Sequence, residues 1–143
     1  MTEAAPSPIV DTERGWAKNH IDEYLAGKTP EFRHGAPVAL LTTRGRSTGT
    51  WHRTALIGAD DGDRVLLVGS GGGDRDPDWY RNLVASPRVW VQKDGTEFWA
   101  LARTAEPEEK PELWDKMVAL FPDYADYQTN TERQIPVVIL ERE

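Results

Sequence analysis

The segment of this chain best suited to bind a ligand is a short run rich in glycine, hydroxyl groups and arginine. The run is Thr42-Thr43-Arg44-Gly45-Arg46-Ser47-Thr48-Gly49. Glycine lets the backbone approach a ligand closely, hydroxyls donate to phosphate oxygens, and arginine adds a planar, permanently charged donor. The run is neither a Walker loop nor the dinucleotide fingerprint. It predicts an anion site, although a surface hairpin with exposed arginines has the same composition.

The distribution of charge supports an anion site in this part of the chain. The net charge is −7, which disfavours a nucleic-acid partner because such proteins carry a basic surface. Yet the stretch from Phe32 to Ala59 contains no Asp or Glu. Its bases are Arg33, His34, Arg44, Arg46, His52 and Arg53. Segregated bases in a loop between two predicted strands indicate a local positive potential, with chance clustering of surface charge as the alternative.

The composition excludes several kinds of chemistry. The chain has no cysteine, which excludes disulfides, thiolate catalysis and cysteine-ligated metals. Its three histidines have no metal-ligand spacing, so no metal site is expected. Redox chemistry would therefore need a bound cofactor. No apolar run approaches the roughly 20 residues that span a bilayer, and the N-terminus does not resemble a signal peptide, so we expect a cytoplasmic protein.

A second candidate segment combines small residues with the start of a helix. Gly69-Ser70-Gly71-Gly72-Gly73 follows a predicted strand and precedes Asp76-Pro77-Asp78, a helix start. Small residues there leave room for a flat ring, and Ser70 could form a hydrogen bond at its edge. A flexible linker is the alternative. On the helix, Asn82 shares a face with Trp79 and either borders a cofactor or lies exposed.

A third candidate segment contributes two phenols. Tyr124 and Tyr127 stand three residues apart after Pro122, which is expected to end a helix. Such phenols can line a pocket mouth, stack on a substrate and donate a proton. Two half-buried surface tyrosines are the alternative. No Ser/His/Asp triad and no close carboxylate pair emerges from the sequence.

The elements that must position these residues follow from periodicity and turn signals. Residues 1–10 read as a disordered tail, and residues 11–143 as one domain that begins with a helix. Helices are expected from Asp11 or Thr12 to Ala26, from Asp76 to just before Pro87, and from Glu106 to Phe121, and strands over 37–43, 51–59, 64–69, 88–93, 96–104 and 135–141. The Asp61-Gly62 and Asp94-Gly95 pairs are hairpin signals, so the sheet is antiparallel. About six antiparallel strands with flanking helices predict a mainly β (α+β) fold closed into a barrel.

These pieces, in this order and spacing, resemble the deazaflavin-dependent nitroreductase family, and its F420H2-dependent quinone reductases in particular. The resemblance runs from about Gly35 to Glu141. Its most specific elements are Thr42-Thr43-x-Gly45-Arg46-x-Thr48-Gly49, Ser70-x-Gly72-Gly73, Pro77-x-Trp79-Tyr80-x-Asn82-Leu83, Pro122-x-Tyr124-x-x-Tyr127 and Arg133-x-Ile135-Pro136-Val137-Val138. The resemblance implies a split β-barrel of the flavin-reductase and pyridoxamine-oxidase type, the deazaflavin coenzyme F420, and hydride transfer to a quinone, enone or nitroaromatic acceptor.

The resemblance also implies roles for individual residues. The cofactor phosphate and polyglutamate tail would contact Arg46, Ser47 and Thr48, and His52 or Arg53 from the next strand. The deazaflavin ring would be bordered by Leu56, Ile57, Val68, Gly69, Ser70 and Gly71 and, on its other side, by Trp79, Tyr80 and Asn82. Tyr124 and Tyr127 would close the pocket near the acceptor, and Ser70, Tyr127 or water would supply a proton.

Four departures from the family pattern bear on affinity and substrate. Ser47 and Gly71 stand where the family often has lysine, and His52 stands at the usual arginine. Phe121 replaces a frequent tyrosine. Each of the first three changes removes or weakens a cation, so weaker binding of the acidic tail is expected, and the fourth predicts a different substrate pocket.

Other classes of protein are compatible with parts of the pattern. Related barrels handle FMN or haem, and a non-catalytic carrier of the deazaflavin or of a lipid-like ligand would share the loop. A plain interaction module is disfavoured because the bases cluster in one loop. The expected partner is a small-molecule acceptor, without nucleic acid or an integral membrane segment. The resemblance leaves room for a homodimer and for peripheral contact with a membrane.

Overall fold

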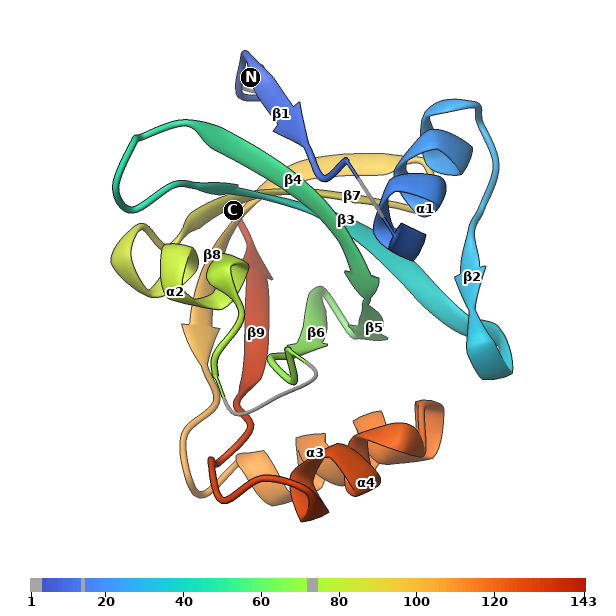
Figure 1. The fold of residues 1–143 in the computed structure, drawn as a ribbon, viewed down its shortest axis with the longest axis vertical. Coiled ribbons are helices and arrows are strands. Elements are labelled where there is room, and N and C mark those ends of the chain that lie inside the picture. Colours follow the sequence, from blue (N-terminus) through green and yellow to red (C-terminus); the bar gives the residue numbers. More distant parts are fainter. Residues whose placement is uncertain (1–3, 14, 72–74) are drawn as a thin grey trace.

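The computed structural model describes residues 4–13, 15–71 and 75–143, which form a twisted sheet with helices around it (Figure 1). The strands are β1 (Ile9–Asp11), β2 (Glu31–Phe32), β3 (Ala36–Arg44), β4 (Trp51–Ile57), β5 (Ala59–Asp61), β6 (Arg64–Val68), β7 (Arg88–Lys93), β8 (Thr96–Thr104) and β9 (Val137–Arg142). The helices are α1 (Gly15–Leu25), α2 (Asp78–Ala85), α3 (Lys110–Leu120) and α4 (Asp123–Thr129), with a single 3-10 turn, η1 (Arg33–Gly35).

The sheet confirms the predicted fold class. Its strand order is β1-β4-β3-β7-β8-β9-β6-β5, with β2 beside β3. Every pair is antiparallel except β1 with β4, which is parallel. The expected closure of the barrel by a complete ladder is not found among the described strands, because β1 and β5 stand at the two ends of the order. The two ends of the strand order are nevertheless connected along the chain, because β4 is followed directly by β5.

Gly58 makes that junction, which splits the strand predicted over residues 51–59 into β4 and β5. Its backbone N–H donates to the Pro37 carbonyl at 3.0 Å. A Cβ atom at Gly58 would lie 2.7 Å from the Cβ of Ala39, so only glycine fits at this close approach. The bend lets consecutive residues pair first with β3 and then with β6.

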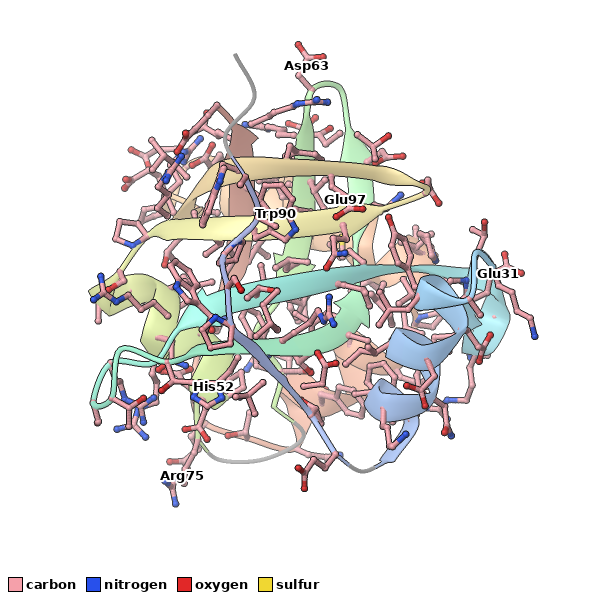
Figure 2. The ribbon with its side chains drawn as sticks, turned by 90° about the horizontal axis from the view of Figure 1, so that it is seen from above. Glu31, His52, Asp63, Arg75, Trp90 and Glu97 are labelled. Carbon is pink, nitrogen blue, oxygen red and sulfur yellow. The ribbon has the colours of Figure 1, made fainter. Side chains whose placement is uncertain are left out.

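The two predicted hairpins are confirmed. Strands β7 and β8 have the bounds expected from the sequence, and both Asp94 (φ 53°) and Gly95 (φ 80°) adopt the left-handed conformation of a type I′ turn. The β5–β6 hairpin turns through Gly62 (φ 65°). In Figure 2 its tip at Asp63 and the β4 residue His52 lie on opposite sides of the molecule.

Helices α1 and α2 and the pair α3 and α4 pack on apolar parts of the sheet and leave pockets between them. Met117 of α3 and Phe121, which directly follows α3, are buried in a cluster that includes Leu66 and Ile139. Leu83 of α2 joins a second cluster, and Ile21 of α1 joins a third under β3 and β4. Burial of such side chains is the main favourable term in folding. The core therefore fixes α1, α2 and α4 at the places where they border the site.

The N-terminal region differs from the prediction. Ile9 and Val10, expected in a disordered tail, belong to β1, which pairs with β4. Helix α1 begins at Gly15, later than expected, because the backbone N–H and the hydroxyl of Thr12 both donate to the Arg53 carbonyl. The N-terminal strand is thereby held against the edge of the sheet.

Two other helix predictions need correction. Helix α2 begins at Asp78 with Pro77 at its N-cap, because the side chain of Asp76, the predicted cap, pairs with Arg133 instead. The second correction concerns Pro122, which was expected only to end a helix. It also starts α4, which the sequence does not predict, because proline fits the first positions of a helix.

Candidate cofactor and substrate site

Two neighbouring pockets contain most of the residues singled out in the sequence. The polar pocket has a volume of about 430 Å³ and is lined by Thr12, Thr43, Gly45, Arg46, Ser47, Thr48, His52, Arg53, Thr54, Asp78, Trp79 and Asn82. The aromatic pocket has a volume of about 460 Å³ and is lined by Trp16, Phe32, Arg33, Leu56, Ile57, Val68, Ser70, Gly71, Trp79, Phe121, Tyr124 and Tyr127. Trp79 of α2 lines both, so the two pockets adjoin.

The basic loop between β3 and β4 forms one wall of the polar pocket. The Gly45 N–H donates to the Thr50 carbonyl at 2.7 Å, and the Gly49 N–H donates to the Gly45 carbonyl at 2.8 Å. A Cβ at Gly45 would lie 2.8 Å from the Thr48 hydroxyl oxygen, and Gly49 has a φ of 74°, so both positions need glycine. The tight turn exposes the hydroxyls of Ser47 and Thr48 at the pocket wall.

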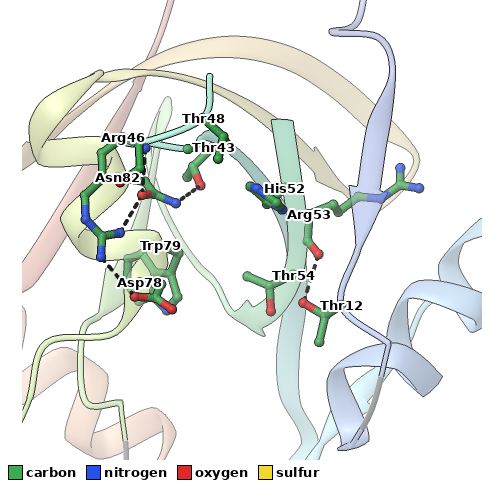
Figure 3. A pocket seen from close by; sticks show the side chains of 12 residues that line it. Thr12, Thr43, Arg46, Thr48, His52, Arg53, Thr54, Asp78, Trp79 and Asn82 are labelled. Carbon is green, nitrogen blue, oxygen red and sulfur yellow. Dashed lines mark hydrogen bonds and ion pairs between the residues drawn. The ribbon is translucent and has the colours of Figure 1, made fainter. Parts of the chain in front are cut away.

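Arg46 is held in place by helix α2 (Figure 3). Its Nη1 donates to Asn82 Oδ1 at 2.7 Å, its backbone N–H donates to the same oxygen at 3.2 Å, and its Nη2 lies 3.3 Å from Asp78 Oδ1. Asn82 is 5% exposed and also donates to Thr43 Oγ1 at 3.4 Å. Asn82 was expected beside the cofactor ring. It lies instead in the polar pocket, where it anchors the guanidinium and the loop.

The neighbouring residues His52 and Arg53 point to opposite sides of β4, as successive strand residues do (Figure 3). The Arg53 guanidinium donates to both oxygens of Asp11, at 2.5 and 3.0 Å, and to Gln92 Oε1 at 3.1 Å. Although Arg53 is among the residues that line the polar pocket, its guanidinium is occupied by these partners and holds β1 against β4. Of the two residues considered for anion binding, His52 presents its side chain to the polar pocket.

The Ser70 loop borders the aromatic pocket. Val68, Ser70 and Gly71 line it, whereas Gly69 packs against Pro136 outside it. The Gly69 N–H donates to the Pro136 carbonyl at 2.9 Å, and a Cβ there would lie 2.9 Å from Pro136 Cγ. Gly69 thus has a packing role, and its predicted contact with a ring stays a prediction. Gly72 and Gly73 lie outside the described residues.

Arg133 fixes the Ser70 loop, a role that the sequence does not indicate. Its Nη1 donates to the Gly69 carbonyl at 3.1 Å and to Asp76 Oδ1 at 2.7 Å, and its Nη2 donates to the Ser70 carbonyl. Gln128 of α4 in turn donates to the Arg133 carbonyl at 2.7 Å. Helix α4 and the Ser70 loop are thus connected through one arginine. Arg133 belongs to the sequence motif Arg133-x-Ile135-Pro136-Val137-Val138, but the residues to which its guanidinium donates lie about 60 positions earlier in the chain.

The aromatic pocket is built from rings of three separate regions. Trp16 and Phe32 lie with their centroids 4.5 Å apart on the N-terminal side. Phe121 and Tyr124 lie 5.1 Å apart on the side of α4, and Tyr127 extends that row. Aromatic rings in offset and edge contacts form a wall on which a flat ring can stack. Leu56 and Ile57 of β4 complete the apolar lining.

The two predicted tyrosines and Tyr80 have different surroundings. Tyr124 is 5% exposed, and burial, with a smaller contribution from Tyr127, raises the pKa of its phenol well above the usual range. The phenol therefore stays protonated and keeps its O–H as a hydrogen-bond donor. Tyr80 lines neither pocket, and its predicted place beside the ring stays a prediction. Its hydroxyl lies 2.8 Å from Thr104 Oγ1, because α2 turns it towards β8.

The fold is a split barrel in which a basic loop adjoins an aromatic pocket, and this arrangement suits a cofactor with an anionic part and a flat ring. The sequence matches the F420H(2)-dependent quinone reductase family over residues 16–142, and the chain belongs to that family. An F420H(2)-dependent quinone reductase of Mycobacterium tuberculosis is 40% identical over 143 residues, which is 89% of this chain and 96% of the relative.

Solved structures of similar fold include two that are more than 30% identical to this chain. An F420-H2 dependent reductase, FDR-A, is 37% identical, with a TM-score of 0.68 over 73% of this chain and 94% of its own. A structure described as a domain-swapped dimer is 34% identical, with a TM-score of 0.70 over 88% and 97% of the two chains. A pyridoxamine 5′-phosphate oxidase-like protein of Listeria innocua, at 16% identity and a TM-score of 0.54 over 74% and 83%, shows the fold alone.

Two further observations concern membranes and metals. Within the described ranges, no helix is both long enough and apolar enough to cross a membrane. The same residues contain no cluster of three or more His, Asp or Glu side chains that could hold a metal ion.

Proposed function

We propose that this protein transfers a hydride from the reduced deazaflavin coenzyme F420 to a quinone, enone or nitroaromatic acceptor. The observation that carries the proposal is the junction at Trp79, where the polar pocket of Arg46 opens beside the aromatic pocket. A cofactor with an anionic tail and a flat ring would occupy both pockets at once. The relatives named F420H(2)-dependent quinone reductases support the same cofactor and acceptor class.

The donor set of the polar pocket suits a phosphate and a carboxylate tail. The residues that would hold these anions are Arg46, Ser47, Thr48 and His52. A guanidinium is a charged hydrogen-bond donor and a hydroxyl is a neutral one, and both can donate to the oxygens of a phosphate or carboxylate. Asp78 partly offsets the Arg46 charge, at 3.3 Å from Nη2. With serine at position 47, the loop carries one cation fewer than the usual family pattern, and we infer moderate affinity for long tails.

The aromatic pocket would hold the ring and the acceptor. The ring would lie against Val68, Ser70 and Gly71, with Trp79 beside it. The coenzyme supplies the hydride when bound, so the protein must align donor with acceptor and exclude water. Tyr124 would donate a hydrogen bond without losing its proton, because its pKa is raised by burial. Tyr127, Ser70 or a water molecule would then supply the proton that completes reduction.

The test is an anaerobic assay that follows oxidation of reduced F420 in the presence of a naphthoquinone, an enone or a nitroaromatic compound. We expect saturable oxidation that depends on both substrates. Absence of oxidation with every acceptor class, despite measurable binding of the coenzyme, would favour a carrier. A purified protein with tightly bound flavin or haem would contradict the proposed cofactor.

We further propose that the protein can form a homodimer and can contact a membrane surface peripherally. One solved relative is described as a domain-swapped dimer, and the short β1 is a separate edge strand that pairs with β4. Light scattering over a concentration series would test the dimer. Sedimentation with anionic and neutral lipid vesicles would test membrane contact, and a protein that remains in the supernatant with both would contradict it.

A further inference from the structure

We infer that Arg33 makes the aromatic pocket selective for acceptors that carry a negatively charged oxygen, such as hydroxyquinones or carboxylated quinones. This inference rests on the proposed function, because it takes the aromatic pocket as the place where the acceptor binds. It adds a substrate class and a specificity residue that the sequence does not suggest. In the sequence, Arg33 counts only as one of the bases in the acid-free stretch.

Within the ranges 4–13, 15–71 and 75–143, twelve residues line the aromatic pocket, and Arg33 is the only charged one among them. The others are aromatic, aliphatic, or small, like Ser70 and Gly71. The side chain of Arg33 is 58% exposed and pairs with one carboxylate, so its attraction for a ligand is partly screened and modest in size. The charge that these lining residues carry is positive, and a ligand of the opposite sign complements it.

The main chain and two rings hold the Arg33 guanidinium at the pocket. Arg33 begins the 3-10 turn η1, in which His34 (φ 64°) and Gly35 (φ 71°) both adopt the left-handed conformation. The guanidinium carbon lies 5.2 Å from the centroid of the Phe32 ring and 5.5 Å from that of Phe121. Planar guanidinium groups stack favourably on aromatic faces, so the two rings limit its movement.

One carboxylate secures one corner of the guanidinium and leaves other donors for a ligand. Asp123 Oδ2 lies 2.9 Å from Arg33 Nη2, and its other oxygen lies 3.7 Å from His34 Nε2. Asp123 does not line the pocket. Arginine has five N–H donors, and within the described ranges Nε and Nη1 of Arg33 donate to no protein atom.

Arg53 is a useful contrast within the same molecule. Its Nε, Nη1 and Nη2 all donate to protein oxygens, and its side chain is 10% exposed. The Arg33 side chain is 58% exposed and has one ion pair. Arg53 thus serves the fold, whereas Arg33 retains donors for an incoming oxygen.

The chemistry of quinone reduction explains why such a donor would help. Hydride transfer brings one proton and two electrons to the quinone, which becomes a hydroquinone monoanion while the reduced coenzyme is oxidised. The new negative charge collects on an oxygen, which can accept a hydrogen bond from Nε or Nη1 of Arg33. A proton from water or Tyr127 then gives the neutral hydroquinone. An acceptor that already carries an anionic oxygen would gain binding from the same contact.

A binding experiment tests this inference without cofactor or turnover. The ligands are naphthoate, an anion, and naphthamide, its neutral counterpart of similar shape. Their dissociation constants are measured by quenching of tryptophan fluorescence, because Trp16 and Trp79 line the pocket. We expect wild type to prefer the anion by about threefold, which is typical of one solvent-exposed ion pair.

Three variants make this test specific. Arg33→Gln should abolish the preference, Arg33→Lys should retain part of it, and Asp123→Asn should increase it. The matched control is Arg81→Gln, because Arg81 is exposed, lines neither pocket, and its loss changes the net charge equally. An unchanged preference in Arg33→Gln would overturn the inference, as would an equal loss in Arg81→Gln.

A kinetic experiment separates this inference from the proposed function. A hydroxynaphthoquinone that is anionic at neutral pH is compared with its neutral methyl ether. Since their redox potentials differ, the measured quantity is the change in their ratio of kcat/KM between wild type and Arg33→Gln. We expect this ratio to fall about threefold. Normal turnover with an unchanged ratio overturns the inference alone, whereas no turnover with either quinone by wild type contradicts the proposed function.

Discussion

The polar pocket and the aromatic pocket differ in how they are assembled. Most residues of the polar pocket come from the segments 43–54 and 78–82, and an ion pair and amide hydrogen bonds fix its central cation. The aromatic pocket draws on α1, β2, η1, β4, the Ser70 loop, α2 and α4. Stacked rings and apolar burial hold it together. A site formed mostly by two short segments can be found in a sequence, whereas a site formed where many elements meet depends on the whole fold.

The same contrast implies different sensitivities to mutation. Loss of a charge in the polar pocket should weaken binding of the anionic part of the ligand with little effect on the core. Loss of a ring in the aromatic pocket should remove packing that also stabilises the protein, because Phe121 and Tyr124 belong to a core cluster. Substitutions in the two pockets should therefore separate effects on ligand affinity from effects on stability.

Phe121→Ala should destabilise the protein by about 3–5 kcal/mol, the usual cost of removing a buried phenylalanine. Phe121 is 1% exposed, and its ring contacts Phe32 and Tyr124. Urea unfolding measures the effect, with Val84→Ala, at a position that is 61% exposed, as the control. Equal stability of both variants would contradict the role of this ring in the core.

Arg133→Met should cost about 2–3 kcal/mol, because it leaves carbonyl oxygens of the Ser70 loop and Asp76 without their charged donor. The variant should also bind the deazaflavin ring more weakly, since the loop that borders it is no longer fixed. Thermal unfolding and titration with a tail-free deazaflavin measure the two effects. Unchanged ring affinity in a destabilised variant would restrict Arg133 to a structural role.

Asp11→Asn should destabilise β1 more than the rest of the protein. The substitution removes the charge that faces both Nε and Nη2 of Arg53, which is 9% exposed. We expect a cost of about 2 kcal/mol, below that of breaking a fully buried pair because the Asp11 side chain is 38% exposed. Amide exchange should increase first in residues 9–12. Uniform exchange across β4 and β3 would contradict a local effect.

We expect Tyr124 to make the free energy of unfolding depend slightly on pH in the alkaline range. Burial raises the pKa of its phenol above the ordinary value of 10.0, so the folded protein holds the proton more tightly than the unfolded chain does. This contribution is complete below pH 10 and is lost as the pH rises further. Tyr124→Phe should therefore reduce the loss of stability between about pH 10 and 12. An identical alkaline profile in the two proteins would contradict the assignment.

Local signals predicted much of the fold. The Asp94-Gly95 pair fixed the β7–β8 hairpin because a type I′ turn needs two residues that tolerate positive φ. The prediction of a disordered tail was wrong at Ile9 and Val10, which lie in β1. The ion pair between Asp11 and Arg53 stabilises this strand, and no local sequence pattern indicates that contact. Helix α4 was missed because Pro122 can both follow one helix and begin another.

The candidate site was predicted unevenly for the same reason. Ser47, Thr48 and Arg46 lie where the loop motif indicated, beside His52. Arg53 and Tyr80 were candidates through their position in a motif, and strand alternation and helix rotation turn their side chains away. Trp16 and Arg33, which line the aromatic pocket, gave no local signal because only the packing of α1 and η1 brings them there.

The most direct test of the division between the two pockets is a titration with two forms of the cofactor. One is oxidised F420, and the other is the ribityl deazaflavin that lacks the phosphate and the glutamate tail. Arg46→Ala should weaken binding of F420 about tenfold and leave the tail-free form unchanged, since a charge-assisted contact of this kind contributes on the order of 1.5 kcal/mol. Arg44→Ala, in the same loop but outside the pocket lining, should leave both affinities unchanged. Equal weakening of both forms by Arg46→Ala, or of neither, would contradict the account.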